Sequence, residues 1–170
     1  MVLNKEKKYL VYFLICLSYF SFIIGFIFDE NSAGGGSYVG DLTWIWKNLE
    51  IFKNNDLLIA INHPDLFGNR APLHYILHKT FNPFIDNIDS YRTSVFFISL
   101  TGPFFFYLCL KEKFKNVDKI LLILISSILL LSPYYRTSAY WGLEENYSII
   151  SMLLSFLFLE YFTKKNDKNL

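Results

Sequence analysis

The sequence has few charges, few cysteines and few histidines. Its 170 residues include 16 Lys and Arg against 15 Asp and Glu, so the net charge is only +1. This balance provides no positive field for a nucleic-acid backbone, and we expect no nucleic-acid partner. The two cysteines, Cys16 and Cys109, lie within apolar runs, so no disulfide is expected. A phosphate-binding P-loop, a dinucleotide fingerprint and a Ser-His-Asp signature are also lacking, which argues against a soluble nucleotide-using enzyme.

Apolar residues are abundant, and they gather in four runs. Hydrophobic residues make up 53% of the chain and aromatic residues 19%, which excludes a disordered or fibrous protein. Residues 9–28 carry no charge, and at about 1.5 Å rise per residue this run can cross a hydrocarbon core of about 30 Å. Shorter runs follow at 94–110, 120–135 and 147–162. The sequence therefore predicts an all-α polytopic membrane protein, a single membrane domain over residues 1–170 with about four transmembrane helices.

The lysines predict the orientation of these helices, because short cytoplasmic loops are enriched in basic residues. Ten lysines fall on one side of the predicted topology, before the first span, between the second and third, and after the fourth. We therefore expect both termini in the cytoplasm, an extracytoplasmic loop at 29–93, and a place in a bacterial inner membrane. The ten are Lys5, Lys7, Lys8, Lys111, Lys113, Lys115, Lys119, Lys164, Lys165 and Lys168.

A cleaved signal peptide is the alternative interpretation of the first run, which has a basic start and is followed by small residues. However, its uncharged stretch exceeds the roughly 7 to 15 residues of a signal core. The acids Asp29 and Glu30 also lie close to any cleavage point. These features favour an uncleaved anchor.

The long loop is predicted to hold two amphipathic helices at the membrane interface. Glycines at 34–40 predict a tight loop, and Asp41 is expected to cap a helix of about three turns. The apolar face of that helix, which includes Trp46, suits a membrane surface. A second short helix is expected to begin at Pro72. The loop has too little continuous core to be an independent soluble domain.

Several polar residues in the predicted outward regions are candidates for chemistry. Asp29 and Glu30 follow the first span, where a carboxylate can act as a general base or simply mark the end of the helix. His74 and His78 stand four positions apart and could bind a metal, although solvated or hydrogen-bonded histidines are the commoner outcome.

The segment 136–146 is predicted to be a short outward loop. Arg136 could bind a phosphate, and Glu144 or Glu145 could orient a sugar hydroxyl. An interfacial aromatic belt with an Arg to Glu pair explains this segment equally well. Arg70 and Arg92 are further phosphate candidates.

These features together resemble the N-terminal part of GT-C glycosyltransferases, polytopic membrane enzymes that use polyprenyl-phosphate sugars. The resemblance is to the family of protein O-mannosyltransferases, aminoarabinose transferases and Rgt-type sugar transferases. It rests on the acids that end the first span, the glycine stretch leading to Asp41, the string at 70–75, and Ser132-Pro133 with the downstream Glu144-Glu145. The motifs are loose, but they follow one another in order over most of the chain.

The resemblance implies an inverting sugar transfer in which Asp29 is the base, Glu30 or Asp41 is a supporting acid, and Arg136 binds the departing phosphate. It implies a polyprenyl-phosphate-linked sugar donor and the lipid bilayer as partners, assigns no metal ligands, and leaves a divalent cation open. Family members have more spans, so we expect a truncated frame or one half of a split protein that a second polypeptide completes. The substrate-binding candidates are Arg70, His74, Tyr75, Arg136, Glu144 and Glu145.

Two alternatives come from other functional classes. A noncatalytic four-helix membrane protein would use its outward loops to bind a partner or a lipid. A small transporter subunit would place ionisable residues near the middle of its spans, and only Glu160 comes near to this requirement.

Overall fold

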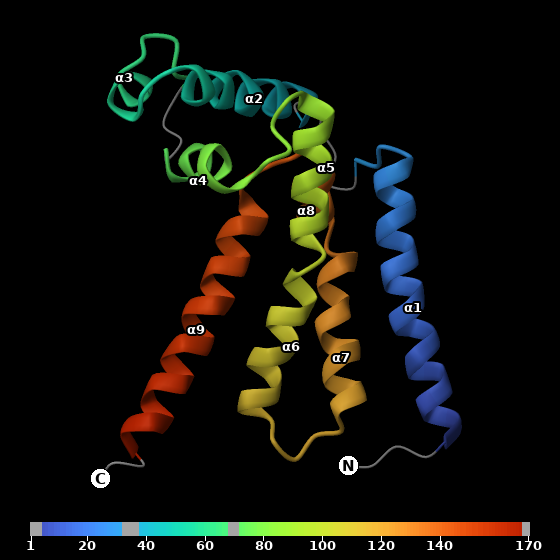
Figure 1. Ribbon diagram of the computed structural model, residues 1–170. Helices are drawn as coiled ribbons and strands as arrows, with labels where there is room; N and C mark the ends of the chain where they lie inside the picture. The colour runs from blue at the N-terminus through green and yellow to red at the C-terminus, as the bar shows by residue number, and fades with distance from the viewer. Residues whose placement is uncertain (1–4, 32–37, 68–71, 168–170) are drawn as a thin grey trace.

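The computed structural model describes residues 5–31, 38–67 and 72–167, and this part of the chain is helical without β-strands. The long helices run side by side, and shorter helices lie across one end of them (Figure 1). The helices are α1 (Lys5–Ile27), α2 (Tyr38–Asn54), α3 (Leu57–Ile61), α4 (Leu73–Phe81), α5 (Ile88–Ser99), α6 (Gly102–Lys113), α7 (Lys119–Ser127), the 3₁₀-helix η1 (Ile128–Leu131), α8 (Pro133–Tyr140) and α9 (Glu145–Asp167).

The short helices α2, α3 and α4 cover one end of the long helices, which we call the capped end (Figure 1). Helix α1 starts and helix α9 finishes at the opposite end. The chain therefore leaves α1 at the capped end, builds the cap, and returns to the far end through α5 and α6. It comes back through α7 and α8 and descends again as α9.

Within the part of the chain that the structure describes, three helical stretches are long and apolar enough to cross a membrane: Lys5–Ile27, Ile88–Lys113 and Glu145–Thr163. This agrees with the predicted helical membrane protein. The second stretch is longer than the predicted run at 94–110, because α5 begins at Ile88 with the Asn87 side chain accepting a hydrogen bond from the Ser90 amide.

The predicted third span is broken in the structure. Residues Lys119–Leu131 and Pro133–Tyr140 form a helix pair bent by 66°. Proline has no amide hydrogen to continue the preceding helix, and the Ser132 side chain accepts a hydrogen bond from the Tyr135 amide to begin the next one. Arg136 consequently lies in helix α8 and not in the loop that the sequence predicted.

The apolar face of α2 corrects a second expectation. Leu42, Ile45, Leu49 and Phe52 are buried inside the protein and do not form a membrane surface. Phe52 stacks on Tyr75 of α4 with ring centroids 5.3 Å apart. The loop segment is therefore part of the main hydrophobic core, which also contains residues of α1, α5 and α8.

Helix α2 also begins earlier than expected. It starts at Tyr38, so Asp41 lies in the first helical turn and is not the residue that caps it. A carboxylate in the first turn still stabilises the helix through its dipole. A helix follows Pro72 in the structure: α4 begins at Leu73, immediately after the proline. Most of the glycine-rich stretch lies outside the described residues.

Candidate functional site at the capped end of the first helix

The candidate site starts where α1 ends, at the two acids that the sequence singled out. Helix α1 stops at Ile27, and Asp29 adopts a left-handed backbone conformation with φ of 52°. Aspartate tolerates this region better than most residues, and it allows the chain to turn away from the helix axis. The Glu30 amide donates back to the Gly25 carbonyl at 2.9 Å, which fixes the turn on the helix end.

Asp29 forms an ion pair with Arg92 of α5, through a hydrogen bond from Nη2 of the arginine to Oδ1 of the aspartate. The Asp29 side chain keeps 60% of its surface exposed, whereas the Arg92 side chain keeps only 15%. Arg92 is held from several directions, because its Nε donates to the Tyr140 carbonyl and its guanidinium lies 4.6 Å from the centre of the Trp141 ring. A reachable carboxylate is thus presented beside a fixed cation.

Glu30 has a different environment from its neighbour. It forms a two-pronged ion pair with Arg136 of α8, in which Nε donates to Oε1 at 3.1 Å and Nη2 donates to Oε2. Its main-chain carbonyl also accepts a hydrogen bond from Nε1 of Trp141 at 3.2 Å. The two adjacent acids therefore differ in their contacts and exposure. Glu30 is bound to α8, whereas most of the Asp29 side chain is exposed to solvent.

Arg136 is buried, with 8% of its side chain exposed. Besides its two bonds to Glu30, its Nη1 donates to Ser21 Oγ at 3.1 Å and to the Leu130 carbonyl at 3.3 Å, and its Nη2 donates to the Ser21 carbonyl at 3.0 Å. All three guanidinium nitrogens are engaged by protein oxygens. A guanidinium held in this way fixes α1 against α8, and the phosphate-binding role predicted for it would require an exchange of these bonds.

A glycine in α1 makes this arrangement sterically feasible. A Cβ atom at Gly25 would lie 2.5 Å from the Tyr140 hydroxyl and 2.6 Å from Nη2 of Arg136. The Tyr140 hydroxyl uses this space to donate to the Phe22 carbonyl at 2.7 Å. Gly25 therefore lets the polar side chains of α8 close on the helix end.

The other predicted site residues lie apart from the two acids along the cap and the start of α9. His74 and Tyr75 are buried in α4, where Nε2 of His74 lies 2.9 Å from the Tyr91 hydroxyl and Asn48 donates to the Tyr75 hydroxyl at 3.0 Å. Glu144 and Glu145 lie at the junction with α9, half-buried and exposed respectively. Arg70 lies outside the described residues, and Asp41 is half-buried in α2.

The two histidines are buried in the protein and hydrogen-bonded, which is one of the two outcomes expected beside metal binding. The Tyr91 hydroxyl donates to the Gly142 carbonyl at 2.6 Å, so the hydrogen on Nε2 of His74 points to Tyr91. That nitrogen is a donor there and not a metal ligand. Over the described residues, no group of three or more His, Cys, Asp and Glu side chains is placed to hold a metal ion.

The sequence indicates Asp29, Glu30 and Arg136 as candidates but does not reveal that the last two form a pair. It also gives no indication of Trp141, which contacts Arg92 and donates to Glu30. One feature of the sequence does indicate such pairs. Arg92 and Arg136 border apolar runs, where a cation needs an acid or another hydrogen-bond acceptor as its partner.

Comparison of the chain with protein-family models, with curated proteins and with solved structures found no match.

Proposed function

We propose that this chain carries the catalytic carboxylate of a membrane glycosyltransferase that moves a sugar from a polyprenyl-phosphate donor to an extracytoplasmic acceptor. The observation that supports this function best is the contrast between the two acids. Glu30 is tied to a buried arginine, while Asp29 stays 60% exposed at the end of an apolar helix. A lipid-linked donor would bring its sugar to the same level of the membrane.

In the proposed reaction the acceptor hydroxyl attacks the anomeric carbon while Asp29 takes the hydroxyl proton. The bond between the anomeric carbon and the phosphate oxygen breaks, and polyprenyl phosphate leaves with the electron pair. The configuration of the anomeric carbon inverts. Arg92, which is paired with Asp29, is the cation that stabilises the departing phosphate. Glu30 and Arg136 act as positioning residues that hold the end of α1.

In this proposal the capped end faces the extracytoplasmic side of a bacterial inner membrane, both chain ends are cytoplasmic, and the bent α7–α8 pair makes a fourth crossing. The lysine distribution supports the orientation. Exposed apolar residues on the cap support contact between its helices and the membrane surface; they are Leu57, Leu58 and Ile59 of α3 and Leu73, Leu77 and Phe81 of α4. A second polypeptide would supply the rest of the donor site.

The alternative is a noncatalytic membrane protein that binds a partner or a lipid. The two ion pairs favour it in one respect, because Asp29–Arg92 and Glu30–Arg136 join α1 to α5 and α8 as structural tethers. In that case Asp29 would have no chemical task.

The proposed activity is tested in membranes of the cells that produce this protein naturally, which would also contain the second polypeptide, and in membranes of the same cells after deletion of the gene for this chain. They are supplied with polyprenyl-phosphate donors carrying radiolabelled mannose, glucose or aminoarabinose, and the products are extracted and analysed for anomeric configuration. The proposal predicts transfer from one donor with inversion. Retention, or no more transfer from any of these donors than in membranes without the chain, would favour the noncatalytic alternative.

A further inference from the structure

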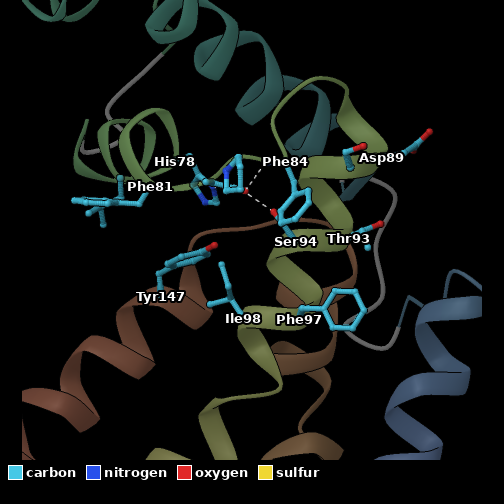
Figure 2. Close-up of a pocket in the computed structure, with 13 residues that line it drawn as sticks. His78, Phe81, Phe84, Asp89, Thr93, Ser94, Phe97, Ile98 and Tyr147 are labelled. Carbon is cyan, nitrogen blue, oxygen red and sulfur yellow. Dashed lines mark hydrogen bonds between the residues drawn. The ribbon is translucent and has the colours of Figure 1, made fainter.

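A cavity of about 740 Å³ lies between α4, α5 and the start of α9 (Figure 2). This volume is within the range of about 300 to 1,000 Å³ that is typical of small-molecule sites. Figure 2 shows His78 entering from α4 and Tyr147 from α9, with α5 beside them. Most of the wall is apolar, and its largest apolar members are Leu77, Phe81, Phe84, Phe97 and Ile98.

The hydrogen bonds around Asn82 determine which nitrogen of His78 carries the hydrogen. The Phe84 amide donates to Oδ1 of Asn82 at 2.9 Å, so Nδ2 of Asn82 must be the atom that faces His78 and Ser94. Nδ2 of Asn82 is a donor and lies 2.8 Å from Nδ1 of His78. Nδ1 therefore accepts, and in the neutral ring the hydrogen is on Nε2.

Nε2 of His78 has no hydrogen-bond partner, although the residue is only 2% exposed. Burial lowers the pKa of His78 to about 4, so the ring is neutral near pH 7. The hydroxyl of Tyr147, across the cavity, is also buried without a partner. Buried polar groups are nearly always hydrogen-bonded, and two orphaned donors at one cavity call for an acceptor supplied by a ligand.

The charges around the cavity limit what this ligand can be. The described residues that line it include no lysine or arginine, and its one ionisable acid is Asp89. A phosphate or carboxylate headgroup would enter without a cation and would be repelled by Asp89. An uncharged oxygen, as in an alcohol or an ester, avoids both costs.

The position of the cavity indicates that the ligand comes from the lipid phase. Two of its walls, α5 and α9, belong to stretches that are long and apolar enough to span a membrane. Phe81, Phe84 and Phe97 are exposed at 76%, 61% and 60%, so the opening is bordered by aromatic rings. Such a border admits a hydrocarbon chain from a bilayer.

We propose that this cavity binds an uncharged single-chain lipid, whose hydroxyl or ester oxygen accepts from Nε2 of His78 and bonds to the Tyr147 hydroxyl while its hydrocarbon chain lies against the phenylalanines. This site is independent of sugar transfer. It also differs in charge from any site for a phosphate-linked donor, so its failure would not affect the function proposed above.

Binding of radiolabelled 1-oleoylglycerol to the purified full chain in detergent micelles tests this site, with oleate as the charged comparison. We expect saturable binding of 1-oleoylglycerol that is stronger than binding of oleate. The variant Tyr147→Phe should weaken it by about twofold to tenfold, the effect of one hydrogen bond. The matched control is Tyr134→Phe, at a tyrosine of α8 that is 80% exposed, and it should bind as the original chain does.

The melting temperature of the lipid-free protein separates a binding role from a structural one. The Tyr147 hydroxyl has no partner in the free protein, so Tyr147→Phe should leave this temperature unchanged or raise it. The proposal is overturned if 1-oleoylglycerol shows no saturable binding, as expected when water alone fills the cavity. Equal binding by Tyr147→Phe, or tighter binding of oleate, would overturn it too.

Discussion

Glu30 and Arg136, 106 positions apart in the sequence, form a two-pronged ion pair that joins the end of α1 to α8. The arginine is almost fully buried, while the glutamate keeps about a third of its side chain exposed, at 36%. The pair therefore fixes the backbone from which Asp29 projects. The Asp29 side chain, which is 60% exposed to solvent, is therefore attached to a backbone that is held in one position.

Arg136→Lys should destabilise the protein although it preserves the charge. The guanidinium makes five hydrogen bonds, to Glu30, Ser21 and Leu130, and an ammonium cannot reach these acceptors with the same fork. We expect a loss of about 1 to 3 kcal/mol, seen as a lower melting temperature in detergent. Lys111→Arg, the reverse exchange at an exposed residue of α6, is the control. Equal melting temperatures for the original chain and both variants would show that the hydrogen bonds of the Arg136 guanidinium do not contribute to stability.

Gly25→Ala should also be destabilising, because the new methyl group would collide with Tyr140 and Arg136. Overpacking of this kind costs about 1 to 3 kcal/mol, against a gain of about 0.5 to 1 kcal/mol from alanine in a helix. Gly40→Ala is a matched control, since a Cβ atom at Gly40 in α2 meets nothing within 4 Å. We expect a lower melting temperature for Gly25→Ala and an equal or higher one for Gly40→Ala. The opposite order would contradict the packing described at α1.

His78 should make stability depend on pH. Its folded pKa is lowered from 6.5 to about 4 by burial, so the unfolded state binds a proton first as the pH falls. The stabilisation is complete above about pH 6.5 and is lost progressively down to about pH 4, by about 3 kcal/mol in total.

Melting temperatures between pH 7.5 and 4 check this dependence in the original chain and in His78→Gln. The variant removes the titrating ring, so its curve should fall less steeply between pH 6.5 and 4. His63→Gln, at a partly exposed histidine between α3 and α4, is the control and should retain the original slope. If His78→Gln falls as steeply as the original chain, His78 is not the group responsible.

The sequence was sufficient to predict the helical membrane class, because long apolar runs with at most one charge are typical of membrane-spanning helices. It also located Asp29 and Glu30 at a helix end. It could not show what covers an amphipathic face, and the face of α2 is buried by protein instead of lying on a membrane. The Glu30–Arg136 pair could not be predicted for a related reason. The local pattern of residue types carries no information on a contact between residues 106 positions apart. The orphaned atoms at His78 and Tyr147 likewise emerge only from three-dimensional packing.

The measurement that tests the central claim most directly compares Asp29→Asn with Glu30→Gln, recording both the rate of sugar transfer and the melting temperature. Asp29 is 60% exposed, and Arg92 keeps the Tyr140 carbonyl and the Trp141 ring as other contacts, so Asp29→Asn should melt almost normally while losing activity by a factor of about 10² to 10⁴. Glu30→Gln leaves the buried Arg136 without its counter-charge and should melt at a clearly lower temperature. A variant Asp29→Asn that transfers sugar at the original rate would contradict the account, since Asp29 would then have no chemical role.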